Sequence, residues 1–116
     1  MNFEQIVEKV CASDKRNKFA ISYAKNPELP QFYHIYDPID VEFDSPIGVI
    51  RMFSIDEIKT EAVNYSYVAG GLIFATSNGD PLFIKNNLVY ICDHGSKNPT
   101  YEKLANSFEE FIKNII

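Results

Sequence analysis

Apolar residues recur at helical spacing near both ends of the chain. Near the start, a stripe at positions i, i+3, i+4, i+7 and i+8 is formed by Phe3, Ile6, Val7, Val10 and Cys11. Such a stripe is typical of the buried face of an amphipathic helix. Asn2 precedes the stripe as a helix cap. Gln5, at the third helical position, is placed to form the reciprocal hydrogen bond of a capping box with Asn2. At the other end, Ser107 to Glu110 form a capping-box pattern before a similar stripe that begins with Phe108 and Phe111. We therefore predict a helix at each end.

The segment that follows the first helix is less regular. Residues 18–25 fit neither the helical nor the strand period clearly, and we expect a second short helix there. Asn26-Pro27 ends that element, and Leu29-Pro30 begins a further short helix that continues to Tyr36, because proline is tolerated in a first helical turn. The N-terminal region is therefore expected to be helical.

Strict alternation of apolar and polar residues begins at residue 39. Residues 39–44 alternate apolar and acidic side chains, which predicts a strand with one buried face. Residues 47–53 predict a second strand. Ser54 to Glu57 then form a capping box, which opens a short helix that ends at about Val63.

Three apolar runs follow at short spacing, over residues 72–75, 82–84 and 88–92. Turn residues at 77–80 and 86–87 join them, so we predict hairpins of an antiparallel meander whose central strands are covered on both faces. The order of elements indicates a single α+β domain over residues 1–116, with one antiparallel β-sheet flanked by an N-terminal helical region and a C-terminal helix.

The composition is acidic: 16 Asp and Glu against 11 Lys and Arg give a net charge of −5. Nucleic acids and anionic membranes both require basic surfaces, so we expect neither as a partner. No apolar run resembles a signal sequence or approaches the roughly 20 residues of a membrane span, which favours a cytoplasmic protein. Cys11 and Cys92 are then expected to be reduced thiols.

No catalytic pattern stands out in the sequence. The 5 glycines do not form a phosphate-binding loop, and neither His34 nor His94 stands in a nucleophile motif. Cys92 and His94 would point the same way in a strand, and Cys11 and His34 would complete the ligand types of a zinc site. The spacing lacks the close ligand pairs of such sites, so buried thiols are the favoured interpretation. We expect no metal, no cofactor and no enzymatic activity.

Negative charge is concentrated in residues 26–62, where eight acidic and two basic residues give −6, while the rest of the chain carries +1. On the predicted strand, Asp40, Glu42 and Asp44 would line one face about 6.6 to 7 Å apart. Carboxylates at that spacing occur in glycosidases and calcium sites, on solvated strand faces and in binding surfaces. The local charge favours a binding surface, to which nearby rings such as Phe32 and Tyr33 could add anchors. The candidate partner-binding residues are Asp37, Asp40, Glu42, Asp44, Asp56, Glu57 and Glu61.

Four segments between residues 27 and 113 resemble the SMI1/KNR4 superfamily, also called SUKH, and they occur in the family's order. They are Leu29-Pro30 with Phe32-Tyr33 and residues 38–43, the strand–turn–strand IFATSNGDPLFI at 73–84, Val89-Tyr90 with His94-Gly95, and LANSFEEF at 104–111. Asn78, Gly79, Asp80 and Pro81 correspond to the family's NGDP-like turn.

The resemblance implies a small α+β domain without a shared catalytic site. Its motif residues imply architecture: a tight turn at Asn78-Gly79, hydrogen bonds to Asp80, a strand start at Pro81, and an exit turn at His94-Gly95. Most bacterial members look like immunity proteins that bind and neutralise a cognate toxin, often a nuclease. We therefore expect a cytoplasmic immunity protein, monomeric or weakly homodimeric, whose partner is a protein toxin. The alternative is a non-enzymatic regulatory or scaffold module that binds a host protein or a small ligand.

Overall fold

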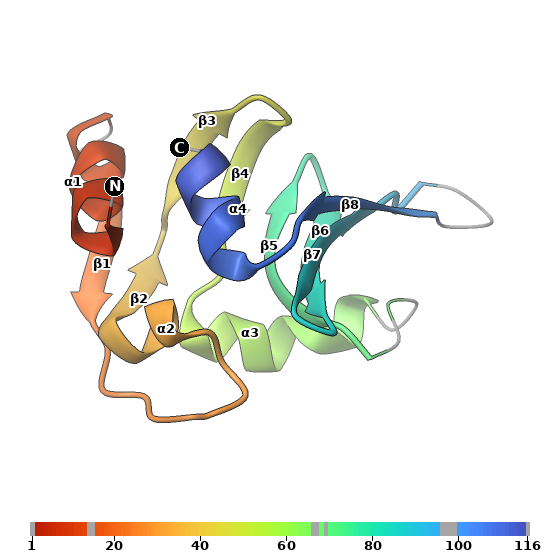
Figure 1. The fold of residues 1–116 in the computed structure, drawn as a ribbon, viewed down its shortest axis with the longest axis horizontal. Coiled ribbons are helices and arrows are strands. Elements are labelled where there is room, and N and C mark those ends of the chain that lie inside the picture. The colour runs from red at the N-terminus through yellow and green to blue at the C-terminus, as the bar shows by residue number, and fades with distance from the viewer. Residues whose placement is uncertain (1, 14–15, 66–67, 69, 96–99, 116) are drawn as a thin grey trace.

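The computed structural model describes residues 2–13, 16–65, 68, 70–95 and 100–115 (Figure 1). Its helices are α1 (Phe3–Ser13), α2 (Gln31–Ile35), α3 (Ile55–Glu61), the 3₁₀ helix η1 (Ala62–Tyr65) and α4 (Phe108–Ile115). Its strands are β1 (Lys18–Ile21), β2 (Tyr36–Ile39), β3 (Glu42–Ser45), β4 (Gly48–Met52), β5 (Leu72–Ser77), β6 (Asp80–Lys85), β7 (Leu88–Cys92) and β8 (Tyr101–Ala105). The predicted α+β class is confirmed. In the described part of the chain, no helix is long and apolar enough to cross a membrane.

The main sheet has six antiparallel strands in the order β3-β4-β5-β6-β7-β8, so the predicted meander is confirmed. The turn between β5 and β6 has φ angles of 53° at Asn78 and 87° at Gly79, and the next turn has 52° at Asn86 and 65° at Asn87. Two consecutive positive φ angles match the right-handed twist of a tight hairpin, which is why these Asn and Gly residues occur there. Strand β8 was not predicted, because its residues YEKLA alternate too weakly to stand out.

Two predictions for the N-terminal half were wrong. Residues 18–21 form strand β1 and not a helix, and β1 pairs with β2 in a second, two-stranded sheet. The strand expected over residues 39–44 is interrupted at Asp40, which has a φ of 55°. Aspartate tolerates this left-handed conformation better than most residues, and the interruption lets β2 pair with β1 while β3 pairs with β4.

The helix caps follow the predicted patterns. The Gln5 N–H donates to Asn2 Oδ1 and the Asn2 N–H donates to Gln5 Oε1, both at 2.9 Å. Ser54 and Glu57 form a reciprocal capping box at the start of α3. At α4, the Glu110 N–H donates to the Ser107 hydroxyl at 3.0 Å. Each cap satisfies backbone donors that a helix leaves unpaired in its first turn.

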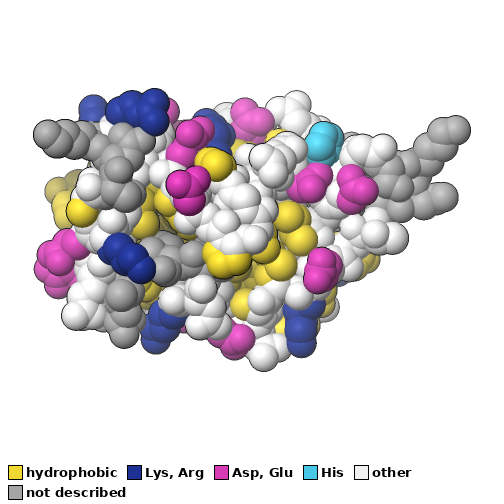
Figure 2. Space-filling model, turned by 90° about the horizontal axis from the view of Figure 1, so that it is seen from above, with side chains coloured by type: hydrophobic (Ala, Val, Ile, Leu, Met, Phe, Trp, Pro, Cys, Tyr) yellow, Lys and Arg dark blue, Asp and Glu magenta, His cyan; other side chains and the backbone are white. Residues whose placement is uncertain are grey.

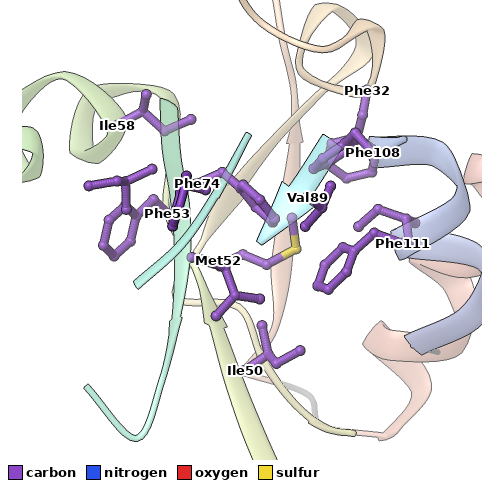
Figure 3. Packing of buried hydrophobic residues seen from close by; sticks show 14 of the residues in the cluster. Phe32, Ile50, Met52, Phe53, Ile58, Phe74, Val89, Phe108 and Phe111 are labelled. Carbon is purple, nitrogen blue, oxygen red and sulfur yellow. The ribbon is translucent and has the colours of Figure 1, made fainter. Parts of the chain in front are cut away.

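The hydrophobic core lies on both faces of the main sheet (Figure 3). On the face that α4 covers, the ring of Phe74 lies 5.1 Å from Phe108 and 5.4 Å from Phe111. Phe53 packs on the other face, where Ile58 of α3 also lies. The central strands are therefore covered on both sides, as their apolar composition predicts.

Candidate functional site

The seven predicted partner-binding acids lie on β2, β3, α3 and the link between β2 and β3; we call them the acidic face. Its members are Asp37, Asp40, Glu42, Asp44, Asp56, Glu57 and Glu61. The structure brings part of this set together around one cation, the guanidinium of Arg51 on β4.

Arg51 has three acidic neighbours. Glu42 is its direct partner in the pairing of β3 with β4, and Glu57 of α3 forms an ion pair with it. The hydrogen bond that Arg51 donates to Glu57, together with the charges of Glu57, Glu61 and Glu42, raises the pKa of Arg51 above its ordinary value, although burial opposes the shift. Its guanidinium also lies 5.6 Å from the centre of the Phe53 ring, within the range of a cation–π contact. One cation therefore faces three carboxylates, and the local charge stays negative.

Three of the seven acids have structural partners within the chain. Asp37 Oδ1 accepts a 2.8 Å hydrogen bond from the Ile55 N–H at the start of α3. Glu61 accepts a 2.8 Å bond from the Asn64 side chain. Burial raises the pKa of Glu57, but hydrogen bonds from Arg51 and Ser54 outweigh burial and hold that pKa below its ordinary value. Asp37 and Glu57 hold α3 against β2 and β4, and all three carboxylates are less available to a partner.

The other four acids, Asp40, Glu42, Asp44 and Asp56, are exposed to solvent. Asp40 lies outside β3, so the predicted ladder of three carboxylates reduces to Glu42 and Asp44 on one face of that strand. Opposite Asp44 lies Val49, whose side chain is 45% exposed. The acidic face thus offers carboxylates with a small apolar neighbour, and it lies at the β3 edge of the sheet.

The rings proposed as anchors do not reach this surface. Phe32 and Tyr33 are 1% and 0% exposed and belong to the core. Phe32 packs against Phe108 of α4, with ring centres 5.7 Å apart. A partner of the acidic face would therefore not contact either of these two rings.

The motif residues of the β5–β6 turn meet the exit of β7. Asp80 Oδ1 accepts a 3.1 Å hydrogen bond from the His94 N–H and lies 2.5 Å from His94 Nδ1. Burial raises the pKa of Asp80, but the hydrogen bonds from His94 outweigh burial and lower it. The imidazole lies over Gly79, where an added Cβ would be only 3.0 Å from His94 Cε1. These residues therefore join two turns that are 14 positions apart in the sequence.

Neither cysteine belongs to a group of three or more potential metal ligands among the described residues. Cys11 and Cys92 are both free, and burial raises the pKa of the Cys92 thiol. His34 Nε2 lies 2.8 Å from the carbonyl oxygen of Asn26. Among the described residues, the only group of potential metal ligands is Asp80, Asp93 and His94, whose ligand atoms lie within 4.8 Å of one another.

Beside this turn, the structure has a second acidic surface, an open groove of about 430 Å³ across the ends of β6, β7 and β8. It is lined by Asp80, Ile91, Asp93, Thr100, Tyr101 and Glu102. Figure 2 shows acidic side chains next to a histidine at this end of the molecule, around exposed apolar atoms. A count of charge along the sequence misses this surface, because its acids stand at positions 80, 93 and 102 and only the strand register brings them together.

Comparisons of the chain with protein-family models, with curated proteins and with solved structures found no match. The resemblance to the SMI1/KNR4 superfamily therefore rests on the motifs themselves.

Proposed function

We propose that this protein is a cytoplasmic immunity protein of the SMI1/KNR4 type, which binds a cognate nuclease toxin and covers the toxin's basic surface with the acidic face. The observation that supports this most directly is the excess of carboxylates at the β3 edge, where exposed Glu42 and Asp44 adjoin the cluster around Arg51. The proposal assigns the protein no catalysis and no cofactor.

The physical reason lies in what a nuclease requires. A nuclease binds phosphates with lysines and arginines, so its active-site cleft is basic. An acidic inhibitor can occupy the same cleft, and opposite charges accelerate the encounter by about 10- to 1000-fold at low salt. Binding should then weaken as the salt concentration rises, because salt screens exposed charges.

The test measures association between the purified protein and the toxin encoded by the adjacent gene. The variant is Glu42→Lys with Asp44→Lys; Asp40 is kept, because a lysine at its φ of 55° would add backbone strain. The matched control reverses Glu4 and Glu8, two exposed acids of α1 outside the acidic face. We expect the first variant to associate at least about tenfold more slowly and to lose protection in cells that express the toxin, while the control protects.

Equal protection by both variants would reject the acidic face as the contact surface. An adjacent gene that encodes no toxin, together with capture of a host protein by the purified chain, would favour a regulatory or scaffold module.

A further inference from the structure

Strand β1 has one edge to which no other described strand is paired, because its sheet consists of β1 and β2 alone. At the end of β1, the Ser22 N–H donates to the Ile35 carbonyl oxygen at 2.9 Å, in the same register as the β1–β2 pairs. Successive residues of a strand direct their N–H and C=O groups to opposite edges. Ala20 therefore points to β2 as Ser22 does, whereas Phe19 and Ile21 point away from it. In the described part of the chain, no hydrogen bond reaches these outward backbone groups.

The same end of β1 exposes apolar side chains. Ile21 is 65% exposed, and Tyr23, two residues further along, is 89% exposed. Phe19 is half-buried, with its ring 6.0 Å from that of Phe32 in the core. Figure 1 shows β1 on the outer side of β2, with its C-terminal end extending past α1. An exposed edge with unpaired backbone groups and apolar side chains is able to pair with a strand of another chain.

The two edges of the main sheet differ from this one. Strand β3 carries exposed Glu42 and Asp44, and β8 carries exposed Glu102 and Lys103. Charged side chains on an edge strand disfavour pairing with a further strand. In β1 the only charged residue is Lys18, at the start of the strand. Strand β1 is therefore the edge best suited to a further strand.

We propose that β1 pairs with β1 of a second copy of this chain, antiparallel across a two-fold axis at Ala20, and that a weak homodimer results. Within β1 only Phe19 and Ile21 face the open edge, so Phe19 of each copy exchanges both of its backbone hydrogen bonds with Ile21 of the other. The two Ala20 residues then face each other as a non-hydrogen-bonded pair, in which side chains approach most closely and a small residue fits. Lys18 lies opposite the uncharged Ser22 of the other copy, so no like charges are opposed.

The edge fits a second copy because it is complementary to itself. A two-fold axis uses the same two outward residues twice, and two-fold dimers are the most common assemblies of identical chains. The side chains of Ile21 and Tyr23, with the strand edge, offer roughly a few hundred Å² per copy. A stable interface buries about 800 Å² per partner, so this dimer should be transient and depend on concentration.

Sedimentation equilibrium between about 20 µM and 1 mM protein tests the association. We expect the average mass to rise from that of one chain towards that of two. Ile21→Lys should weaken association at least about tenfold, because it removes an apolar side chain from the contact in both copies and places a charge beside Phe19. The matched control Val63→Lys, at a residue 78% exposed on η1, should associate as the original chain does. Both positions are largely exposed in one chain, so neither variant should change the midpoint of urea unfolding.

Cross-linking tests the register. The Cα atoms of a non-hydrogen-bonded pair are about 4.5 Å apart, a distance that a disulfide spans. Ala20→Cys should therefore form a disulfide-linked dimer under mild oxidation in a Cys11→Ser background, where the remaining Cys92 is buried. Lys18→Cys is the matched control, because the two copies of residue 18 lie four positions apart along the paired strands, about 13 Å, which is too far for a disulfide.

Three results would overturn the proposal. The first is an average mass that stays that of one chain up to about 1 mM. The second is association that Ile21→Lys leaves unchanged or weakens no more than Val63→Lys does. The third is a failure of Ala20→Cys to cross-link faster than Lys18→Cys. None of these measurements involves a toxin, so their outcome is independent of the proposed immunity function.

Discussion

Replacing Gly79 with alanine is expected to destabilise the fold through two separate effects. Gly79 has a φ of 87°, and an L-residue in a left-handed conformation costs about 1 to 2 kcal/mol. The new methyl group would also lie 3.0 Å from His94 Cε1, so the imidazole must move by a few tenths of an ångström. That movement disturbs its contact with Asp80, which as a partly exposed pair contributes at most about 1 kcal/mol.

The two effects separate in a double-mutant cycle. Gly79→Ala should cost about 2 kcal/mol in total, and His94→Ala about 0.5 to 1 kcal/mol. In the double variant the methyl group no longer meets a ring, so the cost should fall below the sum of the single variants by about 0.5 to 1 kcal/mol. The backbone strain at residue 79 and the loss of the contact between His94 and Asp80 would then remain.

Urea unfolding measures these differences. The chain has no Trp and 7 Tyr, so tyrosine fluorescence and far-UV circular dichroism are the suitable signals. With a urea m-value of about 1 to 3 kcal/mol/M, a loss of about 2 kcal/mol lowers the midpoint by about 1 M. Strictly additive costs would show that the His94 ring does not press on residue 79. A cost below about 0.5 kcal/mol for Gly79→Ala would refute the backbone argument as well.

Two further predictions concern the polar contacts that hold the N-terminal half. Asn17 is 6% exposed, and its side chain donates to the Val10 carbonyl oxygen and accepts from the Glu42 N–H. Asn17→Ala should therefore lower the free energy of unfolding, measured in urea, by about 2 to 3 kcal/mol. A loss below about 1 kcal/mol would contradict this reasoning. Because the pKa of Glu57 is lower in the folded than in the unfolded state, its ionised form adds stability above an unfolded pKa of about 4.3, and this stability is lost as the pH falls through the folded pKa. Arg51→Met should therefore lower stability at pH 7 by about 0.5 to 1 kcal/mol and flatten the decline between about pH 5 and pH 3, whereas Lys59→Met, on the exposed side of α3, should do neither.

Local signals in the sequence predicted the caps and hairpins, because these depend on side chains a few positions apart. Ser54 and Glu57, for example, form their capping box whatever the rest of the chain does. Strand β1 depends on a distant partner. Its Phe19 lies opposite Pro38, and beyond the last pair, Ile21 with Tyr36, the Ser22 N–H donates to the Ile35 carbonyl oxygen. Alanine and lysine in residues 18–25 favour a helix locally, and the pairing with β2 overrides that preference.

The sequence shows which acids make up the acidic face, but it does not show which of them have structural partners within the chain and which are exposed to solvent. Asp37 and Glu57 both act at the start of α3, where their carboxylates accept from the Ile55 and Ser54 backbone N–H groups, only because β2 lies beside that end of the helix. The sequence predicts a concentration of charge, whereas the fold decides which carboxylates remain available. The exposed pair on β3 therefore provides a sharper test of the immunity proposal than the whole set of seven.

The charge of the groove across β6, β7 and β8 depends on the fold even more strongly. Glu102 and Lys103 are neighbours in the sequence and carry opposite charges, and a strand must direct them to opposite faces. Alternation alone does not determine whether Glu102 or Lys103 points into the groove. That choice depends on one extra residue in β8, at the bulge opposite Val89 and Tyr90. Without that residue the groove would contain a lysine among its carboxylates, and its negative charge would be reduced. The charge of this surface is therefore a consequence of strand register and is absent from any linear count of acidic and basic residues.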